Sequence, residues 1–334
     1  MNGPAAIWLE FIGCGLVIGV AGAQLVRYGD ALAAATGLSR GWVGMILMAV
    51  VTSLPELVTG LSAVTVASAP NMAIGDALGS TVFNLALLAL AELIWRRDGL
   101  YVGVGPAAVL SAGAALAMLG LVTLALMLGQ QGSALAIGHV SPFSILLVAV
   151  YGISMRAVYR AEQRSARAMP QAQGAMSLRR ALTGYGSAAV CIVLAGIRLP
   201  IAGVELARVM GWSDSFVGTL LIALATSMPE LVTTVASLRI GAVDLALGNL
   251  LGSNLFDLLI VALDDLAYRG GPIYQHLSAG HTVTALLAAA MTLVVVAALR
   301  RPPRARLLGP LSWVGVLLAL LYLLHVVVQA RQGS

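Results

Sequence analysis

The sequence has few charged residues and no lysine. Only 10% of its 334 residues are charged, whereas a soluble domain usually carries about 25%. Hydrophobic residues make up 60% of the chain, and its mean hydropathy is +0.95. This composition places most of the chain in a lipid bilayer and argues against a soluble core.

Cysteine and histidine are also scarce. Cys14 and Cys191 both lie in apolar stretches, which favours neither a disulfide framework nor a zinc site. The four histidines are scattered and have no metal-ligand spacing. All 19 basic residues are arginines, and they lie between apolar stretches, which is typical of membrane orientation and not of a nucleic-acid surface. We therefore expect the lipid bilayer, and no nucleic acid, as a partner.

Ten apolar stretches are long enough to cross a bilayer as helices, since a hydrocarbon core needs about 20 apolar residues. They are residues 6–34, 40–67, 72–95, 103–129, 141–160, 181–209, 215–238, 243–267, 279–300 and 308–329. The first stretch has neither a basic leader nor a clear cleavage site, so we do not interpret it as a removed signal peptide. The sequence predicts an all-α polytopic membrane protein.

The arginines also predict how the chain is oriented. If the loops after odd-numbered stretches share one side, that side holds fifteen arginines and the other side holds three, with Arg198 left inside a span. The positive-inside rule then places the first side in the cytoplasm and both termini outside. The longest loop, 161–180, becomes a cytoplasmic linker between residues 1–160 and 181–334. We expect a multi-pass protein of the cell (inner) membrane.

The two halves contain a repeated sequence. The first half has VTSLPELVTGLSAV followed by AIGDALGSTVFNLALLAL, and the second has ATSMPELVTTVASL followed by ALGNLLGSNLFDLLIVAL. Glu56 matches Glu230 at an offset of 174, and Ser80 matches Ser253 at an offset of 173. Because each half has five spans, an odd number, the second half enters the membrane in the opposite sense. Two inverted five-helix repeats are typical of transporters with a substrate site near the midplane.

The first repeated motif, T-S-x-P-E, occupies residues 52–56 and 226–230, inside a span each time. Proline has no N–H, so it frees a backbone carbonyl one turn earlier, near Val51 and Ala225. Backbone exposed in this way is tolerated where it lines a site and not where it faces lipid. The freed carbonyls, the hydroxyls and the glutamate together form a set of hard oxygen donors, which Ca2+ and Na+ prefer.

The second repeated motif brings Ser80 with Asn84, and Ser253 with Asp257. Each pair is spaced i and i+4 and therefore shares one helix face. Four of the 14 acidic residues lie in the repeated motifs, and carboxylates within a membrane are costly and usually functional. The candidate ion-binding residues are Thr52, Ser53, Glu56, Ser80, Asn84, Thr226, Ser227, Glu230, Ser253 and Asp257.

At these residues the chain resembles the sodium/calcium exchanger branch of the cation/calcium antiporter superfamily. The resemblance rests on T-S-x-P-E followed by G-S-x-x-x-N/D in duplicate, and it extends more loosely over all ten spans. It implies two central Ca2+ ligands shared with Na+, Glu56 and Glu230. It implies mainly backbone carbonyl donors at Thr52 and Thr226. The flanking Na+ sites would be lined by Ser53, Ser80, Ser227 and Ser253, and Asn84 and Asp257 would complete the cluster.

One residue departs from the family pattern within this region. The family commonly has G-N-x-x-G-S-N in both repeats, and here only the second repeat keeps it, from Gly248 to Asn254. In the first repeat Asp76 replaces the amide. This carboxylate either modulates ion preference as an added titratable group or is hydrogen-bonded to a neighbouring helix.

The function implied by the resemblance is secondary active exchange of Ca2+ for Na+ by alternating access, with the ions as substrates and no resident cofactor. An H+/Ca2+ exchanger, or a K+-dependent Na+/Ca2+ exchanger, would have the same fold. Ser80 and Ser253 favour Na+, whereas Asp76 leaves a proton-driven exchanger open. An intramembrane protease is disfavoured because no histidine lies near Ser53 or Ser227 in the sequence, so we expect no enzyme. A passive channel is disfavoured because four carboxylates at one site would bind Ca2+ too tightly for fast flux. The sequence gives no oligomeric state.

Overall fold

The computed structural model describes residues 4–36, 51–95, 99–132, 136–165 and 176–333. Within these ranges, eight helices have the length and hydropathy of a membrane span. They are α1 (Pro4–Thr36), α4 (Pro70–Ile94), α5 (Pro106–Gln130), α6 (Pro142–Ser165), α7 (Leu178–Met210), α11 (Val243–Ala267), α12 (Gly280–Arg300) and α13 (Trp313–Gly333). A ninth span is bent by 43° between residues 226 and 228. It consists of α8 (Asp214–Phe216), the π-helix η1 (Val217–Ile222), α9 (Ala223–Thr226) and α10 (Met228–Arg239).

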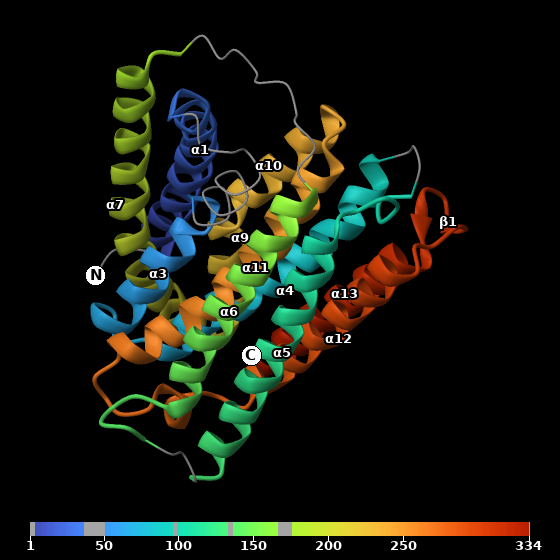
Figure 1. Cartoon of the computed structure of the whole chain (residues 1–334). Helices are drawn as coiled ribbons and strands as arrows, with labels where there is room; N and C mark the ends of the chain where they lie inside the picture. The colour runs from blue at the N-terminus through green and yellow to red at the C-terminus, as the bar shows by residue number, and fades with distance from the viewer. Residues whose placement is uncertain (1–3, 37–50, 96–98, 133–135, 166–175, 334) are drawn as a thin grey trace.

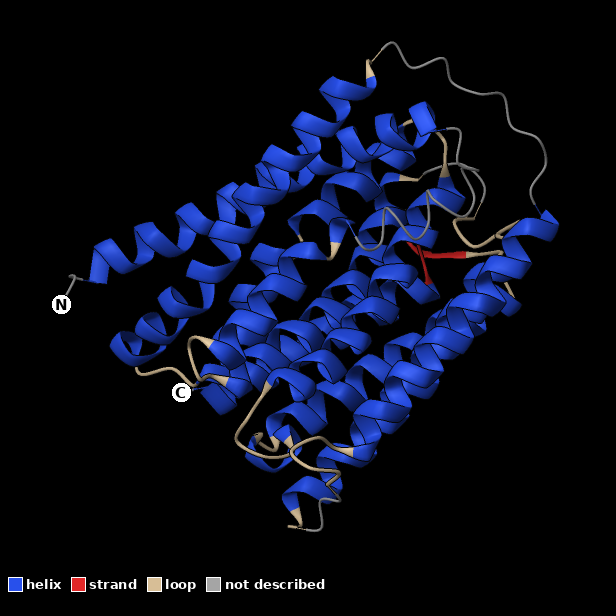
Figure 2. Ribbon diagram, turned by 60° about the vertical axis from the view of Figure 1, so that its left-hand side comes forward, coloured by secondary structure: helices blue, strands red, loops and turns tan. Residues whose placement is uncertain are grey.

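The chain is a helical, multi-pass membrane protein, as the sequence predicts. Of the ten expected spans, only 40–67 falls partly outside the described residues, and its described part contains the helix α3 (Leu54–Thr65). The expected span 308–329 starts too early. A hairpin of β1 (Arg306–Leu308) and β2 (Leu311–Ser312) precedes α13 (Figure 2). Gly309 turns this hairpin with a positive φ of 58°, a conformation that suits glycine and that hydropathy does not detect.

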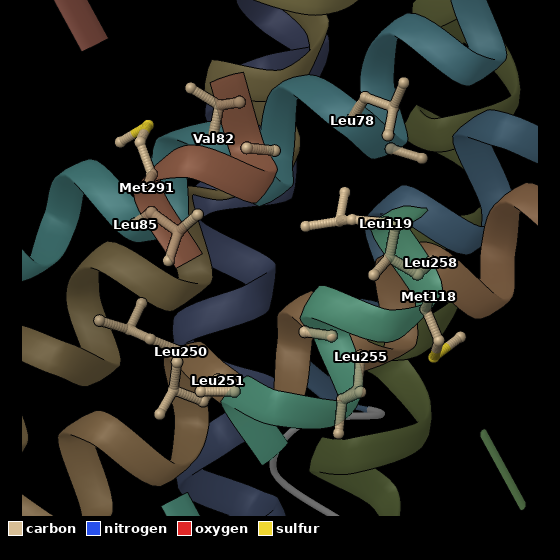
Figure 3. Packing of buried hydrophobic residues seen from close by; sticks show 14 of the residues in the cluster. Leu78, Val82, Leu85, Met118, Leu119, Leu250, Leu251, Leu255, Leu258 and Met291 are labelled. Atoms are coloured by element: carbon tan, nitrogen blue, oxygen red, sulfur yellow. The ribbon is translucent and has the colours of Figure 1, made fainter. Parts of the chain in front are cut away.

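The helices α4 and α11 form the centre of the molecule. In their most apolar windows 72% and 83% of the residues are buried, compared with 28% in α1. Figure 3 shows how leucines of both helices pack with side chains of α5 and α12, among them Leu85, Leu119, Leu258 and Met291. Each central helix is one of the two long helices that carry the second repeated motif. The polar residues of that motif are therefore surrounded by a continuous apolar core.

The helices α1 and α7 pack against each other at one side of this centre (Figure 1). Arg198 of α7 forms an ion pair with Glu10 of α1 and donates a hydrogen bond from Nε to Oε1 over 3.1 Å. The arginine inside the sixth predicted span is therefore a partner in helix pairing. It joins the first helix of one half of the chain to the first helix of the other half.

Two helix caps match each other at the offset of the repeat. Glu92 at the end of α4 accepts hydrogen bonds from the backbone N–H and the hydroxyl of Ser312, at 2.7 and 2.8 Å, just before α13. Asp265 at the end of α11 accepts from the N–H of Ser141 at 2.8 Å, just before α6, and from the hydroxyl of Ser144 at 2.6 Å. Glu92 and Asp265 are 173 residues apart, the offset of the sequence repeat. Each carboxylate caps a helix of the other half, where a negative charge is favourable.

Candidate functional site

The two T-S-x-P-E motifs break their helices in the same way. Ser53 has φ −89° and ψ 12°, and Ser227 has φ −84° and ψ 12°. A new helix starts directly after each serine, with Pro55 or Pro229 in its first turn. A proline there costs no hydrogen bond, because the first N–H groups of a helix have no intrahelical partner. The broken geometry predicted from the two prolines is thus present in both halves.

Both breaks lie against the middle of α4 and α11 and form what we call the central polar cluster. Every side chain in it is at most 2% exposed. The structure brings together all ten candidate residues, together with Asp76 and Asn249. The cluster consists of Thr52, Ser53, Glu56, Asp76, Ser80, Asn84, Thr226, Ser227, Glu230, Asn249, Ser253 and Asp257.

Hydrogen bonds in the cluster are reciprocal between the repeats. Ser53 donates to Oε1 of Glu230 over 3.2 Å, and Ser227 donates to Oε1 of Glu56 over 3.0 Å. Each serine thus contacts the glutamate of the opposite repeat. Such an exchange of equivalent contacts is what a two-fold relation produces.

The threonines follow the same reciprocal scheme. Thr52 donates to Oδ1 of Asn249 over 3.3 Å, and Thr226 donates to Oδ1 of Asp76 over 2.9 Å. Asp76 is therefore hydrogen-bonded to a neighbouring helix, which is one of its two predicted roles. It also lies inside the cluster, so this contact does not remove it as a candidate modulator.

The remaining contacts differ between the repeats. Ser253 donates to Oε1 of Glu230 over 3.2 Å, whereas Ser80 lies 3.5 Å from Oδ1 of Asp76. Asn84 Nδ2 lies 3.5 Å from Oδ2 of Asp257 across the centre. The two repeats therefore share a framework of contacts and differ in where the carboxylates lie.

Several buried acceptors of the cluster have no hydrogen-bond partner among the described residues. They are Oε2 of Glu56, Oε2 of Glu230, Oδ2 of Asp76, Oδ1 of Asp257 and Oδ1 of Asn84. Burying a carboxylate oxygen without a partner is unfavourable, and most buried polar atoms in proteins have one. Such oxygens are the ligand type that hard cations take. No three Asp, Glu, His or Cys side chains in the described ranges are placed to hold a metal ion by themselves, and the carboxylates alternate with hydroxyls and amides.

Glycines allow backbone to approach the cluster closely. A Cβ on Gly79 of α4 would lie 2.2 Å from the carbonyl oxygen of Thr219 in η1, and one on Gly218 would lie 2.5 Å from the carbonyl oxygen of Met72. Gly75 and Gly79, four residues apart on α4, both approach η1 closely at Thr219. The π-helix itself has no sequence signal that we identified. Wide turns of this kind are often found at functional sites.

The helix α1 covers the break at Pro229. A Cβ on Gly22 would lie 2.2 Å from Cγ of Pro229, and Gly15 and Gly19 are the neighbouring contacts on the same face of α1. The equivalent glycine of α7, Gly196, would place a Cβ 2.9 Å from Val58 in α3. Each first helix therefore packs on the broken span of the other half.

Four residues in or near this region were not predicted from the sequence. Asn249 was not among the candidate ligands, although its correspondence with Asp76 was a usable signal. Glu92 and Asp265 act as helix caps across the two halves, which spacing within one half does not predict. Asp264, next to Asp265, is fully buried and has no counterpart acid in the first repeat.

Comparison with known proteins places this geometry in a family. The family model described as "Sodium/calcium exchanger protein" matches residues 6–159 and 181–331. The inner membrane protein YrbG of Escherichia coli (strain K12) is 29% identical over 247 residues, which cover 66% of this chain and 66% of YrbG.

Two solved structures share the fold. The sodium-calcium exchanger NCX_Mj superposes with a TM-score of 0.63 at 22% identity and covers 97% of this chain and 99% of its own. The H+/Ca2+ exchanger CAX gives a TM-score of 0.71 at 18% identity and covers 97% of this chain and 84% of its own.

Proposed function

Because the chain belongs to the sodium/calcium exchanger protein family and is thus an antiporter of the cation/calcium type, we propose that it exchanges Ca2+ for Na+. The exchange takes place at the central polar cluster. Glu56 and Glu230 are the ligands shared by both ions, and the hydroxyls around them complete the Na+ sites. The ions are substrates of transport, and no resident cofactor takes part.

The observation that carries this proposal is the set of five buried acceptors that have no partner among the described residues. Four of them are carboxylate oxygens, one each from Glu56, Asp76, Glu230 and Asp257. Their charge has to be compensated for the cluster to stay buried. A divalent ion can compensate two carboxylates at once, and several Na+ ions can do so by occupying the same oxygens. Competition for shared ligands then couples the two fluxes.

The proposed transport movement involves the first helix of each half of the chain. We propose that residues 1–160 and 181–334 are the two repeats and that 161–180 is a cytoplasmic linker, with both termini outside. The helices α1 and α7, which are joined by Glu10 and Arg198, shift as a unit against the other helices. Because each of them packs through a glycine on the opposite break, their shift would alternately cover and uncover the cluster.

A proton-driven exchanger is the second candidate. Asp76 adds a titratable carboxylate where the second repeat has Asn249, and its Oδ2 has no hydrogen-bond partner among the described residues. The hydroxyls of Ser80 and Ser253 favour Na+, because they enlarge the set of neutral oxygen donors. K+ as a further co-transported ion remains compatible with the same donors.

The decisive experiment is uptake of radioactive calcium into proteoliposomes that contain the purified protein. An outward Na+ gradient should drive uptake, and an outward K+ gradient or a pH gradient without Na+ should not. Uptake that follows the pH gradient and ignores Na+ would establish the proton-driven candidate instead. Uptake that follows no gradient would overturn antiport altogether.

The assignment of the site is tested separately with Glu56→Gln and Glu230→Gln. Both variants should lose Na+-driven calcium uptake while they still purify as folded protein. A conservative change at a cap, Ser144→Ala, serves as the matched control. Normal uptake by both glutamine variants would disprove the site and leave the exchange activity standing.

A further inference from the structure

Two adjacent carboxylates near the end of α11, Asp264 and Asp265, differ in their hydrogen bonding. Asp265 accepts three short hydrogen bonds: from Ser141 N–H at 2.8 Å, from the Ser144 hydroxyl at 2.6 Å and from Ile273 N–H at 2.7 Å. Asp264 is equally buried, at 0% exposed, and neither of its oxygens has a hydrogen-bond partner in the described part of the chain. Helix capping explains the first carboxylate and leaves the second unexplained.

The space around Asp264 is built by a glycine. A Cβ added to Gly60 of α3 would lie 2.8 and 2.9 Å from the two carboxylate oxygens. Any residue other than glycine at position 60 would therefore push the carboxylate out of its place. The close approach of α3 at this point gives Asp264 a backbone neighbour and no side-chain donor.

The feature is not copied in the other half of the molecule. At the repeat offsets, Asp264 corresponds to Ala91 and Gly60 corresponds to Thr234. The mirrored place thus has a small residue on the central helix and a hydroxyl on the broken span. The neighbouring acid Asp265 does have a counterpart, Glu92, whereas Asp264 has none, so the repeat does not account for Asp264.

Asp264 lies between the central polar cluster and the C-terminal ends of α3 and α11. Gly60 is one helical turn beyond Glu56, and Asp264 is seven residues beyond Asp257, in the same direction along both helices. The ends of α3 and α11 lead to the face that the arginine pattern predicts to be outside. An ion that leaves the cluster on that side would pass this carboxylate.

The surroundings discriminate between a metal ion and a proton as the partner of Asp264. A hard cation takes about six or more oxygen ligands, and here one carboxylate faces a glycine. A proton needs one oxygen and removes the cost of an unpaired buried charge. We propose that Asp264 is a proton-binding site, separate from the central polar cluster, that takes up a proton from the outward face when this region closes and releases it when water enters.

Other ionisable groups on the elements packed around α11 contribute to the electrostatic environment of Asp264. They are Glu56 on α3, Asp76 and Glu92 on α4, Glu230 and Arg239 on α10, Tyr151, Arg156, Tyr159 and Arg160 on α6, and Tyr274 and His276 at η2 (Ile273–His276). The sequence of α5 has none. The arginines of α6 lie in its second half, whereas its first residues adjoin Asp265. The acids whose charges act on Asp264 are Asp76 on α4 and the adjacent Asp265, which is already hydrogen-bonded. Among the described residues, no cationic side chain forms an ion pair or a hydrogen bond with Asp264.

Infrared spectroscopy of the protein in lipid tests the protonation directly and does not depend on transport activity. At neutral pH with saturating Ca2+, the wild type should show a carboxylic-acid C=O band that Asp264→Asn and Asp264→Ala lack. Alanine is chosen because Ala91 packs at the mirrored place. The matched control, Asp265→Asn, should keep the band, since Asp265 accepts three hydrogen bonds as a carboxylate. An unchanged band in both Asp264 variants would overturn the proposal.

Transport gives the second readout, and this part rests on the proposed exchange function. Calcium uptake by the wild type should change several-fold as the pH of the outward face rises, whereas Asp264→Asn should keep the low-pH rate throughout. An identical pH profile in wild type and variant would overturn the coupling of this proton to transport. Absence of calcium transport in the wild type would count against the exchange function and would leave the infrared result to decide the proton site.

Discussion

The two repeats share a set of contacts and differ in where one carboxylate lies. In both repeats the serine donates to the glutamate of the other repeat, and the threonine donates to the residue at the Asp76 or Asn249 position of the other long helix. Each repeat also contributes two carboxylates to the cluster. In the first repeat the long helix has its acid at Asp76 and an amide at Asn84, whereas the second has an amide at Asn249 and its acid at Asp257.

This difference distinguishes the hydrogen bonds that hold the broken helices together from the carboxylate positions that we expect to determine ion binding. The serine–glutamate and threonine contacts are the same in both halves. The second carboxylate lies at a different position in each half, at Asp76 in the first and at Asp257 in the second. The electric field inside the cluster is therefore asymmetric, although each half contributes the same number of carboxylates. Variants that equalise or exchange these residues therefore test which property governs transport.

The largest effect is expected from Glu56→Gln and Glu230→Gln. Each should lower calcium exchange by about 100-fold, because removing one member of a buried charge set costs about 3 kcal/mol or more and about 1.4 kcal/mol corresponds to tenfold. Initial rates of Na+-driven calcium uptake measure the loss. Because the two glutamates occupy equivalent places, the two losses should agree within a few-fold, and a large inequality would show that the repeats do not share the ion equally.

A smaller effect is expected from the unequal carboxylates. Asp76→Asn removes a negative charge from the cluster and should therefore weaken calcium affinity. Because the asparagine retains an oxygen that accepts from Thr226, the loss should be limited to about tenfold, the equivalent of about 1.4 kcal/mol. The double variant Asp76→Asn with Asn249→Asp moves the charge to the mirrored place beside Thr52. If charge count governs affinity, the double variant should recover it. If position governs, the double variant stays as weak as the single one. Calcium binding by isothermal titration distinguishes these outcomes.

Next in size is the effect of filling the glycines that let the first helices cover the breaks. Overpacking of this kind costs about 1–3 kcal/mol. Gly22→Ala should reduce the transport rate more than Gly196→Ala, because the new methyl would meet the rigid ring of Pro229 at 2.2 Å and the movable side chain of Val58 at 2.9 Å. Equal rates in the two variants would contradict a role for α1 in closing the site.

Control variants for this pair lie on the same two helices. A Cβ at Gly13 of α1 or at Gly186 of α7 would meet nothing within 4 Å. Gly13→Ala and Gly186→Ala should therefore transport calcium at the wild-type rate. Any loss in these controls would mean that alanine affects the helices themselves and not their contacts.

The smallest effect on transport is expected at the caps. Glu92→Gln and Asp265→Asn each replace a carboxylate that accepts from a helix N-terminus, a contact whose loss costs about 1–2 kcal/mol. Both should lower the melting temperature in detergent by similar amounts and leave the Na+ dependence of calcium uptake unchanged. A change in ion dependence would mean that the caps also shape the cluster.

The sequence predicted most of the architecture because the hydropathy, the prolines and the repeat all act locally. Bounds of the helix α11 agree with the expected span 243–267. The hairpin before α13 was missed because Leu307, Leu308 and Leu311 continue the hydropathy of the helix that follows. The turn at Gly309 depends on backbone conformation, which composition does not reveal.

For the candidate site, the sequence predicted a set of residues that the structure brings together, but it did not predict their partners. The repeat offset shows that Ser53 corresponds to Ser227, yet only the folded chain shows that each of them contacts the glutamate of the other half. The π-helix η1 and the environment of Asp264 depend on contacts between segments more than a hundred residues apart. Such contacts have no local pattern, so spacing within one repeat cannot predict them.

The helix caps have a consequence for how the protein is made. Glu92 in the first half has its donors in Ser312, near the end of the chain. During synthesis, α4 would thus enter the membrane with a carboxylate whose partner has not yet been translated. The first half should stay incomplete until the ribosome has finished the second. By the same logic, two separately expressed halves should assemble into a working exchanger, whereas either half alone should be degraded.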